Sequence, residues 1–324
     1  MLNWGILGTA RINRSLIPPL RLSFRNQLLA VASRDAEKAS AYAKERDIPK
    51  SYGSYEALLA DKDIDVVYIP LPNTMHAEWA IKAAQAGKHV LCEKPLALTV
   101  EDVDKMTAAA KDAGTVLMEA FMYRYHARTL KVKELVEAGE IGKIHHVKGG
   151  FTFALNREGD VRWNNQLGGG SLWDVGCYPL NYARFIIGQE PTHVYGHSVK
   201  SPSGIDVSFT AQLHFPDDIT AQFDSGFRTQ FRMFTEVSGS EGSIALPMTF
   251  KPGMRSYIHL TKGNDTQKIA VDGNLLYLDE VEEMASCIIE KRQPSLSLSD
   301  SRGNIAAIQA LYRSASEGAV IEIQ

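Results

Sequence analysis

The periodicity of apolar residues changes once along this chain, near residue 122, and that change constrains the fold more than any other feature. Before it, short runs of apolar and β-branched residues alternate with longer runs of helical periodicity, which is typical of βαβ units and a parallel sheet. After it, one helical run is followed by several runs of alternating polarity, which predicts a mostly antiparallel sheet. The 324 residues suffice for two domains, each with its own core.

The first part has a regular pattern of elements and stop signals. Gly87 and Gly114 follow helical runs and are expected to end them, and Thr99 is the expected N-cap of the helix that Gly114 ends. The first helix should be bent or short, because Pro18 and Pro19 fall within it. We expect strands at residues 2–7, 28–33, 66–69, 89–92 and 116–120, and helices at 36–46, 76–86 and 100–113.

The second part is expected to be an α+β domain. Its predicted elements are a helix at 128–138, a strand at 145–154, a helix after a triple glycine at 168–170, alternating strands over 193–271, and helices at 279–291 and 300–318. The sequence thus predicts an α/β chain. An N-terminal Rossmann domain with a doubly wound parallel sheet (1–122) precedes an α+β domain with a large, mostly antiparallel open sheet (123–324). The last helix is a candidate to pack back on the first domain. Active-site chemistry is expected in a cleft between the domains.

Composition favours a small-molecule partner. The formal net charge is −3, so the overall charge favours neither nucleic acid nor an anionic membrane as a binding partner. The start of the chain has no basic leader-like region and no stretch reaches the ~18 apolar residues of a membrane span, so we expect a cytoplasmic protein. Cys92, Cys177 and Cys287 are widely spaced and odd in number, which indicates reduced thiols rather than disulfides or a zinc site. No metal is expected, since His145 and His146 are adjacent in a predicted strand and face opposite ways.

The turn between the first strand and the first helix is the predicted dinucleotide site. Compared with G-x-G-x-x-G, Gly8 is retained, while Ala10 and Asn13 replace the second and third glycines. The alternative is that Gly8 merely permits a tight turn. Amides at the start of a helix suit a pyrophosphate. The cofactor-contacting residues expected here are Gly8, Thr9, Ala10, Arg11 and Ile12.

The end of the second strand favours NADP over NAD. An NAD-binding protein places a carboxylate there for the ribose hydroxyls, whereas this chain has Ser33 and Arg34. A guanidinium and a hydroxyl suit a 2′-phosphate. Asp35 comes one position later and could instead cap the next helix. The alternative for Arg34 is a solvated surface charge, with NAD as cofactor.

Two further motifs follow predicted parallel strands, at the edge where doubly wound sheets bind ligands. One is Pro72-Asn73-Thr74-Met75-His76, preceded by Leu71, and the other is Glu93-Lys94-Pro95 within the run from 86 to 97. Leu71, Pro72, Asn73, His76, Glu93 and Lys94 are therefore further expected cofactor contacts. Together with G-G-G-x-x-x-D-x-G-x-Y at 168–178, these motifs resemble the Gfo/Idh/MocA oxidoreductases across essentially the whole chain, nearest the dihydrodiol and D-xylose dehydrogenase subgroup.

This resemblance implies catalytic roles for Lys94, Asp174 and Tyr178. In the family the lysine of E-K-P reaches the nicotinamide ribose and the reacting hydroxyl, and the following proline has a cis peptide bond. Many members have histidine where this chain has Tyr178. Free tyrosine titrates near 10, so it can exchange a proton near neutrality only if a cation such as Lys94 lowers its pKa. Asp174 would orient the substrate or the lysine.

Each of these residues also has a structural alternative. Lys94 could be a surface lysine, Tyr178 a core aromatic, and Asp174 a carboxylate that interacts with a helix dipole. On an α-helix that begins near Leu172, Asp174 and Tyr178 would share one face. Further substrate contacts, with plain packing as their alternative, are expected at Phe121, Tyr123, Arg124, Arg162 and Trp163.

The sequence therefore predicts an NADP-dependent oxidoreductase that transfers hydride between the nicotinamide and a carbinol carbon of an aldose, inositol, dihydrodiol or similar substrate. The alternatives are a keto-sugar or enone reductase, and a non-catalytic NADP-sensing protein. A homodimer or homotetramer that packs through the second-domain sheet is also expected, because helices are available for only one face of that sheet and the other face, if apolar, needs cover. The family resemblance implies the same assembly.

Overall fold

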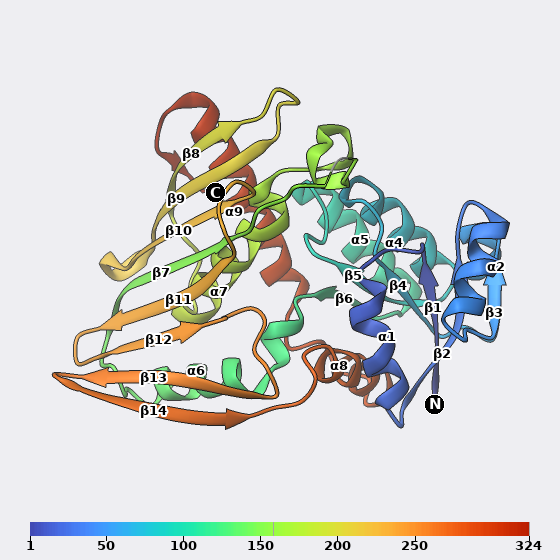
Figure 1. Cartoon of the computed structure of the whole chain (residues 1–324), viewed down its shortest axis with the longest axis horizontal. Coiled ribbons are helices and arrows are strands. Elements are labelled where there is room, and N and C mark those ends of the chain that lie inside the picture. Colours follow the sequence, from blue (N-terminus) through green and yellow to red (C-terminus); the bar gives the residue numbers. More distant parts are fainter. Residues whose placement is uncertain (158, 324) are drawn as a thin grey trace. The chain divides into compact units, whose positions relative to one another are not determined.

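The computed structural model describes residues 1–157 and 159–323. By its internal contacts the chain divides into two units, each described by itself below (Figure 1). Unit 1 comprises Met1–Met122 and Tyr277–Arg302, and unit 2 comprises Tyr123–Leu276 and Gly303–Gln324.

Unit 1 has a six-stranded parallel sheet in the order β3-β2-β1-β4-β5-β6. The order reverses between β1 and β4, which is the switch point where doubly wound sheets bind ligands. The strands are β1 (Leu2–Leu7), β2 (Asn26–Ala32), β3 (Lys50–Tyr52), β4 (Val66–Ile69), β5 (His89–Glu93) and β6 (Leu117–Ala120). All four residues of β4 are buried, as expected for a strand covered on both faces.

The helices of unit 1 begin and end mostly where their capping residues predict. The Asp35 carboxylate accepts a hydrogen bond from the Lys38 amide at 3.0 Å, so Asp35 is an N-cap. Thr99 is another, because its hydroxyl accepts from the Asp102 amide at 3.1 Å. The helices are α1 (Asn13–Leu22), α2 (Ala36–Glu45), α3 (Tyr55–Leu59), α4 (His76–Gln85), α5 (Val100–Ala113) and α8 (Leu278–Ile289). The first helix accommodates Pro18 and Pro19 and, at 10 residues, is no shorter than α2 or α4. β3 and α3 were not predicted, because each is too short for its periodicity to be recognised.

Helix α8 belongs to unit 1, although sequence analysis placed everything after residue 122 in one second domain. The Arg25 guanidinium donates to the Glu282 carboxylate at 2.6 Å and to the Ser286 hydroxyl at 2.9 Å. Val281 is fully buried on the same helix. The last helix, α9 (Leu298–Glu317), begins in unit 1 and lies in unit 2 from Gly303 onward. These attachments depend on contacts between distant residues and leave no local signal.

Unit 2 has a nine-stranded sheet in the order β14-β13-β12-β11-β7-β10-β9-β8-β15. Every pairing is antiparallel except that of β7 with β10, so the expected mostly antiparallel sheet is confirmed. The strands are β7 (Ile144–Thr152), β8 (His193–Lys200), β9 (Asp206–His214), β10 (Thr220–Gly226), β11 (Arg232–Gly239), β12 (Ser243–Pro247), β13 (Arg255–Lys262), β14 (Asp265–Asp272) and β15 (Ile321–Glu322).

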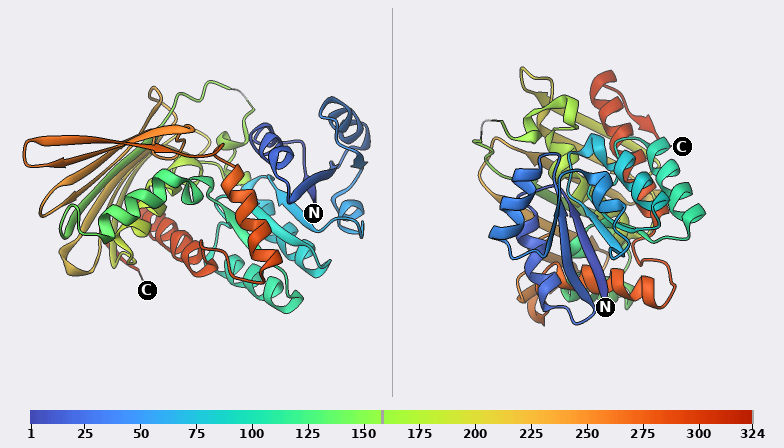
Figure 2. Two further views of the ribbon diagram at one scale, coloured as in Figure 1. Left: turned by 90° about the horizontal axis from the view of Figure 1, so that it is seen from below. Right: turned by 90° about the vertical axis from the view of Figure 1, so that its right-hand side faces the viewer.

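Within unit 2, helices α6 (Ala127–Glu137), α7 (Cys177–Ile187) and α9 gather on one face of the sheet (Figure 2). A Cβ added at Gly149 of β7 would lie 3.1 Å from Pro179 of α7, which places the odd-numbered side of β7 against that helix. The opposite face carries a register row that is largely polar. From β8 to β14 this row is Tyr195, Gln212, Gln222, Lys148, Glu236, Ala245, His259 and Lys268.

Candidate active site

The turn after β1 is built for close approach of a ligand to the backbone. Gly8 has φ +101°, and a Cβ there would lie 3.1 Å from Leu71. The buried Asn13 side chain donates to the Gly8 carbonyl at 3.0 Å, so it closes the turn at the position of the third fingerprint glycine. Helix α1 begins at Asn13, and the loop before it is partly exposed. A glycine turn that leads into a helix N-terminus fits the pyrophosphate of a dinucleotide.

Arg34 is exposed at the end of β2, where sequence analysis expected a 2′-phosphate contact. Burial raises the pKa of the Tyr55 hydroxyl, and the charge of Arg34 partly opposes that rise. Tyr55 packs edge-on against Trp79 at 4.8 Å between ring centroids, which fixes its ring. Sequence analysis missed Tyr55 because the short helix α3 gave no signal. Ser33 is buried, and its hydroxyl accepts from the Asp35 amide at 3.3 Å.

His76 links two backbone segments of the candidate site. Its ring is fully buried, with Nδ1 2.9 Å from the Pro95 carbonyl and Nε2 2.8 Å from the Leu71 carbonyl. Burial lowers the pKa of His76, and the two carbonyls oppose that shift. A neutral imidazole has one N–H and therefore donates to one of these carbonyls at a time. The geometry supports a positioning role for His76, which sequence analysis had grouped with the cofactor contacts.

Glu93 is the last residue of β5 and Lys94 follows it, and the Lys94–Pro95 peptide bond is cis. The Tyr68 hydroxyl donates to Glu93 Oε1 at 2.5 Å, and the Lys94 amide donates to Glu93 Oε2 at 3.3 Å. Two residues after Lys94, the Leu96 amide donates to the buried Glu119 carboxylate at 2.8 Å. The backbone on either side of Lys94 is therefore fixed by carboxylates. Pro72 and Asn73 lie in the short helical turn that precedes α4, and both are partly exposed.

Helix α8 adds a second buried acid to this part of unit 1. Glu280 is fully buried, and burial together with the charge of Glu93 raises its pKa well above the ordinary value. Tyr277, also on the segment that returns to unit 1, lies in the same electrostatic environment, and burial raises its pKa. Neither residue belongs to a motif at a strand end, so nothing in the sequence marked them.

In unit 2, Asp174 and Tyr178 project from one continuous helical segment with two geometries. Leu172–Gly176 forms a π-helical turn and Cys177–Ile187 continues as α7. The α-helical spacing assumed from sequence therefore does not hold at Asp174, because a π turn is wider than an α turn. Tyr178 is 6% exposed, and its ring contacts Phe151, Phe250 and Tyr123 at 5.6, 5.4 and 5.9 Å between centroids.

The loop before the triple glycine brings Arg162 to Asp174. Arg162 Nε donates to Asp174 Oδ2 at 2.6 Å, while Nη1 donates to Asp160 Oδ1 at 3.1 Å. The Asp174 charge is the main reason why the pKa of Arg162 is raised. Sequence analysis had named both Arg162 and Asp174 as candidates without predicting that they pair.

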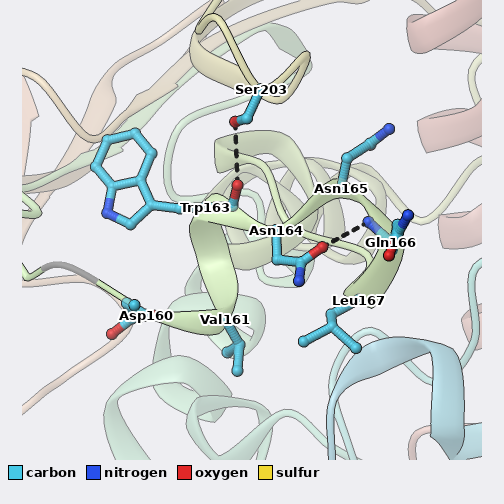
Figure 3. A pocket seen from close by; sticks show the side chains of 9 residues that line it. Asp160, Val161, Trp163, Asn164, Asn165, Gln166, Leu167 and Ser203 are labelled. Atoms are coloured by element: carbon cyan, nitrogen blue, oxygen red, sulfur yellow. Dashed lines mark hydrogen bonds between the residues drawn. The ribbon is translucent and has the colours of Figure 1, made fainter.

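Trp163 lies on the same loop, beside a pocket (Figure 3). The Trp163 indole nitrogen donates to the Arg157 carbonyl at 3.1 Å. The Ser203 hydroxyl donates to the Trp163 carbonyl, also at 3.1 Å. The pocket lining is rich in amide side chains and comprises Gly159, Asp160, Val161, Trp163, Asn164, Asn165, Gln166, Leu167 and Ser203. Such a lining is suited to hydroxyl groups, which both donate and accept hydrogen bonds.

Phe121, Tyr123 and Arg124 are buried. The Tyr123 hydroxyl and Arg124 Nη1 both donate to Asn181 Oδ1, at 2.6 and 2.9 Å, and Arg124 lies 4.0 Å from the ring centroid of Phe185. Tyr123 and Arg124 thus hold Asn181, which lies three residues after Tyr178 on α7. Direct contact of these residues with substrate stays a prediction.

Within 1–157 and 159–323, no group of three or more His, Cys, Asp or Glu side chains is arranged to hold a metal ion. In the same ranges, no helix is long and apolar enough to cross a membrane.

Comparison with known proteins decides the family. Residues 2–121 match the model of an oxidoreductase family with an NAD-binding Rossmann fold, and residues 129–245 match the GFO/IDH/MocA C-terminal domain. The chain belongs to the Gfo/Idh/MocA family. As a Gfo/Idh/MocA protein it is an oxidoreductase that uses a nicotinamide dinucleotide and acts on CH–OH groups, and the expected nicotinamide cofactor is confirmed.

Gfo/Idh/MocA relatives include several sugar-related enzymes. A D-xylose 1-dehydrogenase (NADP(+)) of Haloferax volcanii is 38% identical, over 99% of each chain. A trans-1,2-dihydrobenzene-1,2-diol dehydrogenase of Xenopus laevis is 30% identical over 92% of this chain and 93% of the relative. An aldose-aldose oxidoreductase from Caulobacter crescentus, solved with glycerol, superposes with a TM-score of 0.92, 30% identity and 99% coverage of both chains. These matches confirm the subgroup that the motifs indicated.

Proposed function

We propose that this Gfo/Idh/MocA chain transfers hydride between NADP and a carbinol carbon of a sugar or sugar-like substrate. The observation that carries the proposal is the Arg162–Asp174 ion pair. Asp174 lies four residues before Tyr178 on the same helical segment. A carboxylate accepts hydrogen bonds and a guanidinium donates them, so the pair can bind the adjacent hydroxyls of a polyol. The 38% sequence identity with a D-xylose 1-dehydrogenase (NADP(+)), over 99% of each chain, supports the same substrate class.

NADP is the proposed cofactor because of Arg34. The exposed guanidinium lies at the end of β2, and its donors can bind a 2′-phosphate there. A 3-ketoreductase from Actinomadura kijaniata, 27% identical with a TM-score of 0.92, was solved in complex with NADP. The nicotinamide supplies the hydride acceptor and donor when it is bound.

The chain's own residues would handle the proton and the orientation of the substrate. Tyr178 exchanges the proton of the reacting hydroxyl, with Lys94 as the cation that makes this exchange accessible near neutrality. Asp174, whose charge is held by Arg162, accepts from a hydroxyl on the neighbouring carbon. His76 and Glu93 fix the backbone on either side of Lys94, which sets the point from which its side chain extends.

A second candidate is reduction of a keto-sugar by the same residues acting in reverse. It is favoured by a dTDP-3,4-didehydro-2,6-dideoxy-alpha-D-glucose 3-reductase of Streptomyces violaceoruber, 35% identical over 82% of this chain and 78% of the relative. Proton exchange through Tyr178 and orientation by Asp174 serve either direction.

The deciding experiment is a two-way substrate panel read by the absorbance of reduced nicotinamide. Aldoses, inositols and dihydrodiols are offered with NADP and with NAD, and keto-sugars with NADPH and NADH. D-xylose is the first aldose to test. Oxidation of an aldose with NADP supports the proposal, and turnover of keto-sugars alone supports the second candidate. Binding of NADP without turnover of any compound would contradict both.

A further inference from the structure

A buried carboxylate in unit 2, Asp206 at the start of β9, lies directly under the segment that carries Asp174 and Tyr178. The side chain is 2% exposed and accepts three hydrogen bonds. Its Oδ2 accepts from the Ser171 hydroxyl and from the Leu172 amide, both at 2.7 Å, and its Oδ1 accepts from the Tyr312 hydroxyl at 2.6 Å. Ser171 and Leu172 lie at the entry to the π turn.

We propose that Asp206 is a positioning residue that anchors the π turn Leu172–Gly176 and thereby sets the directions of Asp174 and Tyr178. The inference rests on the proposed function of those two residues. Its bonds to Ser171 and Leu172 fix the point at which the segment that carries Asp174 and Tyr178 starts. A helix start left without such a partner would have an unsatisfied amide and would fray.

The anchor joins three elements to the π turn. Ser171 Oγ lies 3.1 Å from Ser225 Oγ on β10, and Tyr312 comes from α9, where its ring also contacts Trp173 at 5.5 Å between centroids. Asp206, Ser225 and Tyr312 are far apart in the sequence but meet at one end of the turn. A π turn has weaker support from its own hydrogen bonds than an α turn, so external bonds at its start matter more.

The anchor also explains two glycines of the G-G-G-x-x-x-D-x-G motif. Gly170 has φ +121°, and a Cβ there would collide with Asp206 Oδ1 and lie 3.1 Å from the Tyr312 hydroxyl. A Cβ at Gly176 would lie 2.8 Å from Leu172 and 2.9 Å from Ser225 Oγ. Both glycines therefore permit the π turn to lie close against this cluster. Burial raises the pKa of Asp206, and its three donors oppose the rise.

The test combines a structural measurement with kinetics in three variants of the full chain. Asp206→Ala removes the acceptor. Asp206→Asn keeps an oxygen for Leu172 and Ser171 and turns an amide N–H toward Tyr312, whose hydroxyl can accept. Val194→Ala, in the buried part of β8 away from this cluster, is the control for a general loss of stability.

Hydrogen exchange of the peptide over residues 170–178, which needs no substrate, is the first readout. Asp206→Ala should raise exchange there by about tenfold or more and leave the sheet peptides unchanged. With the best substrate from the panel, kcat should fall about 10- to 100-fold at an unchanged KM for NADP, since small misplacements have effects of that order. Asp206→Asn should restore most of the protection from exchange and most of kcat. Val194→Ala should have no selective effect on exchange over residues 170–178 or on kcat.

Two results would overturn the anchor. One is unchanged exchange over 170–178 in Asp206→Ala, and the other is a kcat loss no larger than that of Val194→Ala at matched thermal stability. If Asp206→Ala does not fold, Ser171→Ala carries the test, because it removes one bond to the same carboxylate. Failure of the proposed function is distinguishable, because the wild type would then turn over no sugar while the exchange readout still reports on the anchor.

Discussion

Arg162 and Asp174 form a charge-assisted hydrogen bond of 2.6 Å between the loop before the triple glycine and the π turn. The same guanidinium also holds Asp160, so one side chain fixes two carboxylates at once. This geometry requires a planar fork of donors, which lysine lacks. The pair therefore ties the conformation of the Trp163 loop to that of Asp174.

Replacing Arg162 with lysine should weaken substrate handling while cofactor binding stays intact. Lysine keeps the positive charge but cannot bridge Asp160 and Asp174, so Asp174 loses its fixed orientation. We expect kcat/KM for the sugar to fall by about 10-fold or more, a loss equivalent to one charge-assisted hydrogen bond. Steady-state kinetics with the sugar and with NADP varied in turn measure this. A larger change in the KM for NADP than for the sugar would contradict it, and Arg157→Lys, on the same loop, is the control.

Tyr178→Phe should lower turnover by about 100- to 10,000-fold, the usual contribution of a general acid-base group. NADP affinity, measured by fluorescence titration, should be unchanged, because the phosphates are expected to bind at the Gly8 turn and not at Tyr178. Lys94→Ala should be at least as harmful. The double variant should be little worse than the poorer single variant, since groups that act as one unit are not additive. Retention of more than about half of the wild-type rate by Tyr178→Phe would rule out the acid-base role.

Arg34→Ala should reduce the preference for NADP over NAD. The loss should be about 10- to 100-fold in the ratio of the two dissociation constants, because a charge-assisted contact with a phosphate contributes about 1.5–3 kcal/mol. Tyr55→Phe should shift the ratio less and in the same direction, because it removes a hydroxyl that interacts with the Arg34 charge and leaves the guanidinium in place. Exposed Lys38→Ala on α2 is the charge-matched control. If wild-type protein binds NAD more tightly than NADP, the assignment of Arg34 fails.

His76 should make the protein less stable in acid. Its pKa is lowered in the folded state, so the native ring is neutral while the unfolded ring titrates near 6.5. The unfolded state then binds more protons, and the free energy of unfolding should fall as the pH drops below that value. Denaturant titrations between pH 7.5 and about 5 measure the slope. His76→Asn should be less stable at neutral pH but show a shallower slope, whereas an unchanged slope would contradict the prediction. His89 and His146, also with lowered pKa values, contribute equally to both proteins.

Association through the face of the nine-stranded sheet opposite α7 remains a prediction. In the described part of unit 2 this face is largely polar, so polar contacts rather than an apolar core would hold a dimer or tetramer. Gln212 and Gln222 are adjacent and exposed near its centre. Gln222→Lys should shift the mass seen by light scattering toward the monomer, and exposed Gln293→Lys in unit 1 should not. A monomer for the wild type at micromolar concentration would contradict the prediction.

The sequence alone determined the elements whose signals are local. The glycine turn at Gly8, the caps at Asp35 and Thr99, and the motif at Glu93-Lys94-Pro95 each follow from residues that are close together in the chain, so pattern and chemistry sufficed. The family resemblance then indicated Asp174 and Tyr178. Short elements such as β3 and α3 escaped, because three to five residues do not define a period.

Only the tertiary structure decided which side chains support the site. Arg162 meets Asp174, Tyr55 meets Arg34, and Asp206 meets Ser171 and Tyr312 through contacts between segments 12 to 106 residues apart. The π geometry at Leu172–Gly176 and the return of α8 to unit 1 likewise depend on packing against distant elements. Local propensity does not specify such contacts, because the free energy that selects them comes from burial and hydrogen bonding in the folded chain.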